Sequence, residues 1–268
     1  MYTLGVRAGG RVFTSVYMHP ARMMNYKQKT ILITGGATGI GYALATRFVE
    51  ANNRVIICGR REDKLAQAKE LFPQLEVLKC DVSNQRERVS LYQRTVELFP
   101  EVSVLINNAG IQNRPAPLTQ LQDWEEHRRE LATNIEAPMH LSMLFVHHFL
   151  NKPEAAIMNV SSGLSFSPLS FMPTYCATKA ALHSFTLSLR HQLRETGIRV
   201  LEIIPPKVNT DLGGVGLHDD GVPLADFADS AFAAIIEGRL EFGYGFSEKN
   251  RLASRAELDQ VFSLLNGK

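Results

Sequence analysis

Short runs of consecutive apolar residues recur along the chain, separated by longer stretches with apolar residues three or four positions apart. A strand buried on both faces of a sheet has such an unbroken apolar run, whereas a half-exposed strand alternates apolar and polar residues. The runs predict strands over Thr30–Thr34, Arg54–Cys58, Glu76–Cys80, Val102–Ile106, Ala155–Val160 and Arg199–Ile204.

The stretches between these strands have the spacing of amphipathic helices, which pack one face on a core. Strands that alternate with helices form parallel sheets. The fold class is therefore α/β, a Rossmann-type doubly wound parallel sheet in a single domain over residues 27–268. We expect helices over Tyr42–Ala51, Glu62–Leu71, Gln85–Phe99, Asp123–Phe149 and Thr174–Glu195, with a kink or boundary at Pro138.

The start of the chain differs in character from the rest. A secretory signal needs an unbroken apolar stretch, which Gly9-Gly10-Arg11 interrupts. We expect residues 1–26 to be an extension outside the folded core, with a transit peptide as the alternative. Residues 1–29 contain no acidic residue and five basic ones, Arg7, Arg11, Arg22, Lys27 and Lys29.

Composition excludes several classes of protein. The chain has 268 residues, a net charge of +2 and 45% hydrophobic residues, so it can bury a large core and offers no basic surface for nucleic acid. No apolar run approaches the roughly 18 residues of a membrane span. The three cysteines form no CxxC pair and are odd in number, which favours free thiols in a reducing, cytoplasmic compartment.

A glycine-rich turn joins the first predicted strand to the first helix. Gly35, Gly39 and Gly41 let the backbone approach a pyrophosphate closely. The amides of Thr38 and Ile40 lie at the helix start, where partial positive charge attracts phosphate. An ordinary strand-to-helix turn is the alternative, but the placement of the glycines favours a dinucleotide site.

The spacing Gly-x-x-x-Gly-x-Gly resembles the short-chain dehydrogenase/reductase family, which transfers a hydride between a nicotinamide cofactor and a carbonyl or alcohol. Asp81-Val82 after the third strand resembles the family's adenine-contacting pair. Asn107-Asn108-Ala109-Gly110 after the fourth strand resembles the signature that supports the sheet and lines the nucleotide. The resemblance extends over residues 28–210.

The end of the second strand determines which nucleotide such a site prefers. Enzymes that bind NAD usually place a carboxylate there for the ribose hydroxyl, but this chain has Arg60 and Arg61. A guanidinium favours a ribose phosphate through charge-assisted hydrogen bonds. We predict NADP(H), with Arg60 as the main phosphate ligand and Arg61 stacking on adenine or adding charge. A solvated arginine pair is the alternative.

Tyr175 and Lys179 lie four residues apart in a predicted helix, so their side chains share one face. A nearby ammonium lowers the pKa of a tyrosine from its usual value of roughly 10, which suits proton transfer. The pair alone occurs by chance in many proteins. Its context is informative because Ser162 ends the fifth strand, at the sheet edge where ligands bind.

The family resemblance implies a role for each of these residues and for Asn134. Ser162 and Tyr175 would hold the substrate oxygen, and Tyr175 would exchange the proton as general acid or base. Lys179 would bind the nicotinamide ribose and tune Tyr175. Asn134 would distort its helix and connect Lys179 to solvent through water, with a plain helical asparagine as the alternative.

One turn departs from the family pattern. After the last strand the family usually has Pro-Gly, which positions the nicotinamide, whereas this chain has Pro205-Pro206. Pro206 lacks an N–H donor and the freedom of glycine, so we expect a stiffer turn. Val208 and Thr210 still match the family's carboxamide and phosphate contacts. The turn and the tail Phe242–Ser247 resemble the oxidoreductases named after the bacterial lipoteichoic-acid D-alanylation operon.

Other signals concern assembly and substrate. His140, His147 and His148 lack an accompanying carboxylate or cysteine, so we expect a packed or interface helix face and no metal. The resemblance implies a homodimer or homotetramer built on that helix and the one with Tyr175. Residues 213–223 predict a mobile lid over a small-molecule carbonyl or alcohol substrate.

The sequence leaves two alternatives to an active reductase, a sensor and an epimerase. A nucleotide-binding sensor of this fold usually lacks the tyrosine or the lysine, and both are present here. A nucleotide-sugar epimerase has other glycine spacing and a longer C-terminal substrate domain than residues 211–268 provide.

Overall fold

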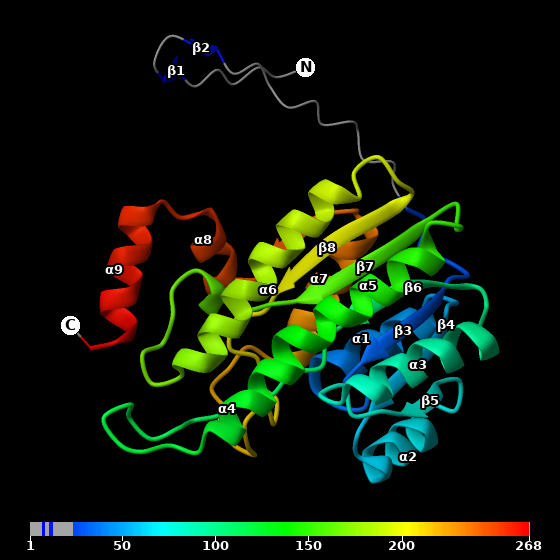
Figure 1. Cartoon of the computed structure of the whole chain (residues 1–268), viewed down its shortest axis with the longest axis horizontal. Helices are drawn as coiled ribbons and strands as arrows, with labels where there is room; N and C mark the ends of the chain where they lie inside the picture. The colour runs from blue at the N-terminus through cyan, green and yellow to red at the C-terminus, as the bar shows by residue number, and fades with distance from the viewer. Residues whose placement is uncertain (1–6, 9–10, 13–23, 268) are drawn as a thin grey trace.

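The computed structural model describes residues 7–8, 11–12 and 24–267. Its centre is a seven-stranded sheet in the order β5-β4-β3-β6-β7-β8-β9, and every neighbouring pair is parallel (Figure 1). The predicted doubly wound α/β fold is confirmed. In chain order the strands are β3 (Thr30–Thr34), β4 (Arg54–Gly59), β5 (Glu76–Lys79), β6 (Val102–Asn107), β7 (Ala155–Val160), β8 (Ile198–Ile204) and β9 (Glu241–Gly243).

The apolar runs of the inner strands are buried on both faces because successive side chains of a strand point to opposite sides. The expectation was wrong for β5, which lies at the sheet edge and exposes Val77 and Lys79. Ile31 and Ile33 of β3 pack into one core cluster, and Leu32 packs into the other. The first cluster lies beneath α1 (Gly39–Glu50), α2 (Glu62–Leu71) and α7 (Leu224–Ile236). The second lies beneath α3 (Gln85–Leu98), α5 (Ala137–Phe149) and α6 (Pro173–Gln192), which cover the near face of the sheet in Figure 1.

The long helix expected over Asp123–Phe149 is divided into three segments. A π-helical turn, Ala132–Glu136, separates α4 (Trp124–Leu131) from α5. The irregularity therefore precedes Pro138, which sits in the first turn of α5, where its missing N–H is tolerated. Helix α5 begins one residue before Pro138, so the predicted boundary is confirmed, and the distortion lies in the turn that precedes it.

Several elements were not predicted. Strand β9 extends the sheet by one edge strand, and α7, α8 (Phe246–Leu252) and α9 (Arg255–Leu265) follow the predicted core. Helix α1 starts at Gly39, inside the glycine-rich turn, instead of at Tyr42. Near the start of the chain, β1 (Arg7–Ala8) and β2 (Arg11–Val12) pair antiparallel. The rest of the expected extension over residues 1–23 lies outside the described residues.

Candidate active site

A cavity of about 1250 Å³ opens at the carboxyl ends of the parallel strands, the edge at which open α/β sheets bind ligands. It is larger than most pockets for one small molecule. The predicted site residues that line it are Gly35, Thr38, Gly39, Ile40, Arg60, Arg61, Asp81, Val82, Asn108, Ala109, Gly110, Ser162, Tyr175, Lys179, Pro205, Val208 and Thr210. Gly41 and Asn134 lie behind this wall.

The first turn of α1 presents free backbone donors to the cavity. Thr38 is the N-cap residue, and within the described chain its side chain makes no capping bond to the turn. The first turn also has no acidic residue. Its N–H groups and the positive end of the helix dipole therefore face the cavity, which is the arrangement that binds phosphate.

Asn108 fixes the glycine-rich turn to the end of β6. Its Nδ2 donates to the carbonyl oxygens of Thr34 at 3.0 Å and Gly35 at 3.1 Å. A Cβ atom at Gly41 would lie 2.3 Å from that nitrogen and 2.5 Å from the Gly35 oxygen. Gly41 is therefore required for space, since any side chain would push the turn away from Asn108.

Both arginines after β4 are exposed and border the cavity. Arg61 reaches the glycine-rich turn, where its Nη2 lies 3.4 Å from Thr38 Oγ1. Among the described residues, neither Arg60 nor Arg61 forms an ion pair with a carboxylate. Two uncompensated guanidinium groups thus stand at the entrance to the turn, and Arg61, not Arg60, contacts it.

The segment after β5 also borders the cavity. Asp81 accepts hydrogen bonds from Ser83 N at 3.0 Å and Ser83 Oγ at 2.8 Å, which holds the turn that starts α3. The Val82 carbonyl accepts from Arg88 Nη1 at 2.6 Å. The carboxylate and the adjacent Val82 are thereby fixed at the cavity wall.

Tyr175 and Lys179 lie one turn apart near the start of α6 and are buried at the cavity. Lys179 Nζ donates to the Val160 carbonyl at 2.9 Å and lies 5.7 Å from the centroid of the Tyr175 ring. Burial lowers the pKa of Lys179 to about 8, although the carboxylates of Glu130 and Glu202 raise it. The ammonium is therefore held charged at neutral pH by nearby acids.

Burial raises the pKa of Tyr175, and a hydrogen bond with Ser162 opposes this by lowering it. The neighbouring ammonium alone would lower the pKa of Tyr175, but the pKa is raised. Removing the phenolate from water costs more free energy than the hydrogen bond with Ser162 recovers. Ser162 lies two residues after the end of β7, and its Oγ accepts from Leu164 N at 3.2 Å. Tyr175 is therefore a protonated phenol that points at a serine hydroxyl.

Asn134 lies in the π-helical turn, and its amide binds a strand-end loop. Its Oδ1 accepts from Ile111 N at 2.9 Å and its Nδ2 donates to Ile111 O at 2.8 Å. A Cβ atom at Gly110 would lie 3.5 Å from Asn134 Oδ1 and 3.6 Å from Lys179 Nζ. Gly110 thus separates the two side chains, and the helix distortion expected at Asn134 is present.

A buried polar cluster next to the tyrosine was not predicted. Glu202 of β8 accepts from Ser161 Oγ at 2.5 Å, and its second oxygen lies 2.8 Å from His183 Nδ1. The carboxylate is 1% exposed, and its hydrogen bond raises the pKa of His183. A glutamate inside the apolar run of β8 was the available signal, since a buried carboxylate needs partners.

The segment after β8 folds across the cavity. Gly163 N donates to the Pro205 carbonyl at 3.0 Å, which joins this turn to the one after β7. Val208 forms an isolated parallel bridge with Val222, and the predicted lid lies between them at the cavity wall. The mobility expected of residues 213–223 stays a prediction.

The last helix completes one wall of the cavity. Leu265 of α9 lines it. Asn266, just beyond the helix, accepts from Ser170 N at 2.6 Å and donates to the Pro168 carbonyl at 3.0 Å. A helix close to the C-terminus is thereby tied to the segment that leads into Tyr175.

Known proteins share the sequence pattern and the fold of this chain. A family model described as short chain dehydrogenase matches residues 29–219. The chain belongs to this family. It is similar to the uncharacterized oxidoreductase DltE of Bacillus subtilis, with 42% identity over 91% of this chain and 98% of that protein. It is also similar to a serine 3-dehydrogenase of Agrobacterium fabrum, with 34% identity over 68% of this chain and 73% of that one.

Solved structures share the fold at low identity. A short chain dehydrogenase/reductase from Burkholderia phymatum in complex with NAD superposes with a TM-score of 0.79 at 20% identity, covering 91% of this chain and 98% of the other. A short chain dehydrogenase from Burkholderia cenocepacia in complex with NADP gives a TM-score of 0.77 at 22% identity, covering 90% and 99%. The chain is an oxidoreductase of this type, and related structures bind either nucleotide.

Over residues 7–8, 11–12 and 24–267, no three His, Cys, Asp or Glu side chains are grouped so as to hold a metal ion. Over the same residues, no helix combines the length and the apolar character needed to cross a membrane. Cys58, Cys80 and Cys176 are free and buried.

Proposed function

We propose that the protein transfers a hydride between NADP(H) and a carbonyl compound or secondary alcohol, with Tyr175 as general acid and base. The observation that carries this proposal is the shared cavity. One end has an open helix N-terminus and two unpaired arginines, and the other has Tyr175 and Ser162 beside a buried lysine. A nicotinamide dinucleotide can occupy both ends of this cavity at once, because its phosphates and its nicotinamide are far apart.

The residues present fit a nicotinamide dinucleotide. Backbone donors at the start of α1 suit the pyrophosphate, and close packing at Gly41 keeps side chains out of the turn. The adenine would lie beside Asp81 and Val82, and the nicotinamide beside Pro205, Val208 and Thr210. Asn108, Ala109 and Gly110 would line the nucleotide between these two regions.

A preference for NADP(H) follows from charge at the end of β4. The described residues there include two guanidinium groups and no carboxylate aimed at the ribose. A phosphate attracts both arginines, whereas a ribose hydroxyl gains little from them. Because Arg61 contacts Thr38 of the phosphate-binding turn, we assign it a role equal to that of Arg60.

The bound cofactor supplies or accepts the hydride. Ser162 Oγ and Tyr175 Oη hold the substrate oxygen, and Tyr175 donates its proton as that oxygen gains negative charge. The raised pKa of Tyr175 keeps it protonated for this step. In alcohol oxidation the Lys179 ammonium stabilises the phenolate that accepts the proton, and Lys179 would also hold the nicotinamide ribose. Asn134 orders a water that returns the proton to solvent.

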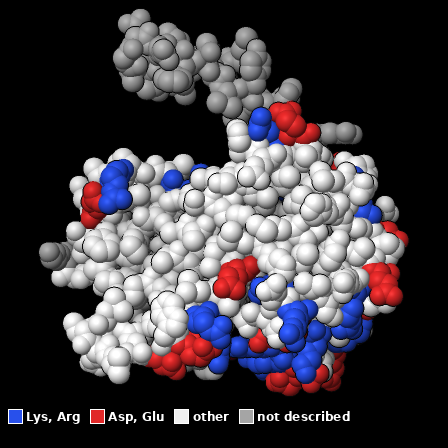
Figure 2. Space-filling view, in the orientation of Figure 1, with Lys and Arg blue, Asp and Glu red and all other residues white. Residues whose placement is uncertain are grey.

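The assembly proposed is a homodimer or homotetramer in the cytoplasm. Figure 2 shows that the face over α5 and α6 has few charged side chains. Met143 of α5 and Leu187 of α6 are 54% and 42% exposed on these helices. An uncharged face with exposed apolar side chains is typical of subunit interfaces.

The test is a nucleotide-consumption assay on a panel of ketones, aldehydes and alcohols, with NADPH and NADH side by side. We expect turnover with NADPH preferred, and loss of turnover in Tyr175→Phe with NADPH binding unchanged. Turnover that survives in Tyr175→Phe would exclude the mechanism, and a preference for NADH would exclude the role of the arginines. Tight NADP binding without turnover on any compound would favour a sensor.

A further inference from the structure

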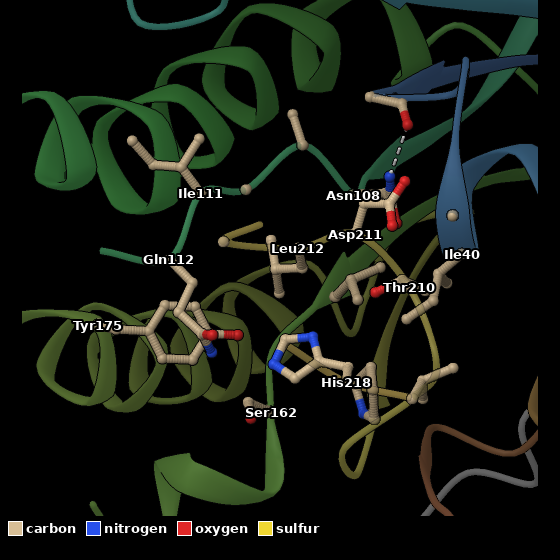
Figure 3. A pocket seen from close by; sticks show the side chains of 18 of the residues that line it. Ile40, Asn108, Ile111, Gln112, Ser162, Tyr175, Thr210, Asp211, Leu212 and His218 are labelled. Atoms are coloured by element: carbon tan, nitrogen blue, oxygen red, sulfur yellow. Dashed lines mark hydrogen bonds between the residues drawn. The ribbon is translucent and has the colours of Figure 1, made fainter. Parts of the chain in front are cut away.

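Two polar side chains that the proposed mechanism does not use point into the substrate end of the cavity. Gln112 follows the loop after β6, and His218 comes from the segment after β8. Figure 3 shows both side chains directed into the same space as Tyr175 and Ser162. Residues 106 positions apart in the chain therefore meet in front of the proposed acid.

The segment that carries His218 is fitted closely to Gln112. Gly213 has a φ of +81°, which favours glycine, and a Cβ atom there would lie 3.0 Å from Gln112 O and 3.3 Å from Gln112 Oε1. Only a glycine permits this approach. The spacing between Gln112 and the His218 segment is thus set by backbone contact.

Both side chains hold buried polar atoms that lack partners. Gln112 and His218 are each 7% exposed. Within the described part of the chain, Gln112 Oε1 and His218 Nδ1 make no hydrogen bond. Such groups are rare in folded proteins and each costs about 1–3 kcal/mol. Two such unpaired atoms on one cavity wall indicate a ligand that forms a hydrogen bond with each of them.

The two atoms are hydrogen-bond acceptors. Burial lowers the pKa of His218, with Arg114 and Lys207 adding to the effect, so the ring is neutral at neutral pH. A backbone hydrogen bond with Thr210 opposes that shift. Because Nδ1 has no partner in the described chain, the bond to Thr210 involves Nε2, and in the neutral ring with its proton on Nε2 the lone pair of Nδ1 is free to accept. Gln112 Oε1 is an acceptor in any protonation state.

The remaining wall near Tyr175 is apolar, which favours a neutral ligand. The charges near His218 are mixed, since Arg114 and Lys207 lower its pKa while Asp220 raises it and pairs with Lys207, so a neutral hydroxyl is the donor that suits both acceptors. The apolar wall is formed by Leu164, Leu169, Met172 and Leu212.

We propose that Gln112 and His218 form a hydroxyl-binding subsite, so that the preferred substrates are short hydroxy ketones or hydroxy aldehydes and the corresponding diols. This inference rests on the proposed function. In the reducing direction the carbonyl carbon gains the hydride of NADPH, its oxygen gains the Tyr175 proton, and the products are the diol and NADP⁺. The hydroxyl held by Gln112 and His218 does not react.

The test uses matched pairs that differ by one hydroxyl: hydroxyacetone against acetone, and acetoin against butanone. We expect kcat/KM to be about tenfold or more higher for the hydroxylated member of each pair, because it alone satisfies the buried acceptors. Aminoacetone serves as the ammonium analogue and should rank below hydroxyacetone. Gln112→Met and His218→Phe should each lower the ratio within a pair toward one.

A matched control and a binding measurement make the test independent of turnover. Val215→Ala changes an exposed residue of the same segment that lies off the cavity wall, and should keep the wild-type ratio. With NADP⁺ present, the vicinal butanediol should raise the unfolding midpoint more than sec-butanol does, and this difference should disappear in both variants. Gln112→Met should not unfold earlier than the wild type, since it removes an unpaired buried acceptor, whereas His218→Phe also loses the bond to Thr210.

The outcomes separate the two proposals. If no carbonyl compound is reduced, the proposed function fails, and the diol shift still decides the subsite. If carbonyls are reduced with a ratio near one, or the ratio persists in both variants, the subsite is excluded while the proposed function stands. A ratio that falls together with a lower unfolding midpoint in both variants would also exclude it, since a structural role is then sufficient.

Discussion

Burying the Lys179 ammonium costs folding free energy, and Lys179→Met is expected to recover part of that cost. The side chain is 4% exposed, and its pKa falls from 10.5 to about 8. At about 1.4 kcal/mol per pKa unit this corresponds to roughly 3 kcal/mol at neutral pH. The value of about 8 already includes the attraction of both nearby carboxylates.

The loss of one hydrogen bond opposes the gain. Methionine cannot donate to the Val160 carbonyl, which accepts from Lys179 Nζ at 2.9 Å, and such a bond contributes about 1–2 kcal/mol. The net expectation for Lys179→Met is a gain of about 1–2 kcal/mol. For a chain of this length that is an increase of about 2–8 °C in unfolding midpoint. Turnover should be lost at the same time.

The stability difference between Lys179→Met and the wild type should depend on pH. A lysine whose pKa is lower in the folded state binds its proton less readily than in the unfolded chain, so the wild type is penalised below about pH 8. The penalty fades between about pH 8 and 10.5 as the folded lysine loses its proton first. The advantage of Lys179→Met should therefore be largest near pH 7 and decline over that interval.

The assay is urea unfolding without added nucleotide at pH 7 and pH 10, with Lys249→Met as the exposed control. Lys249→Met should leave stability unchanged at both pH values. A Lys179→Met protein that is less stable than the wild type at pH 7, or equally more stable at both values, would refute the electrostatic origin of the cost.

Three further expectations follow from contacts described above. Gly41→Ala should destabilise the fold by about 1–3 kcal/mol and weaken NADPH binding measured by titration, because its Cβ would lie 2.3 Å from the Asn108 amide nitrogen. Gly59→Ala, with its nearest neighbour at 3.9 Å, should be neutral for stability. Glu202→Gln should lose stability relative to the wild type mainly at acidic pH in thermal unfolding. The raised pKa of His183 contributes stability below its unfolded value, which is lost as pH rises through the folded value, so equal loss at pH 5 and pH 9 would contradict this. Pro206→Gly should lower the unfolding midpoint by an amount equivalent to about 0.4–1 kcal/mol while turnover persists, and a loss of turnover would show that the stiff turn is needed for chemistry.

Much of the fold could be predicted because the decisive residues act locally. The consecutive apolar residues 155–158 of β7 indicate burial on both faces without knowledge of its neighbours, and all residues of the strand are buried. The turn at Gly35 and the Tyr175–Lys179 spacing are also local patterns. Strand β9 escaped prediction because three residues give no periodicity, and its pairing with β8 is purely tertiary.

The parts of the site that escaped prediction depend on packing between distant segments. His218 is unremarkable in sequence, and its position follows from a bridge between Val208 and Val222. The π-helical turn at Asn134 requires the Ile111 backbone as partner, which only the folded chain supplies. The direction of the Tyr175 pKa shift depends on how much water the fold removes, which spacing along a helix does not specify.

Helix α9 allows the substrate wall to change without cost to the core. None of its described side chains is buried, yet Leu265 lines the cavity and Asn266 holds the segment before Tyr175. Substitutions on an exposed helix typically alter stability by less than about 0.5 kcal/mol. Mutations in α9 can therefore accumulate and reshape substrate preference, so this helix is where we expect members of the branch to diverge in specificity and where a directed-evolution library should begin.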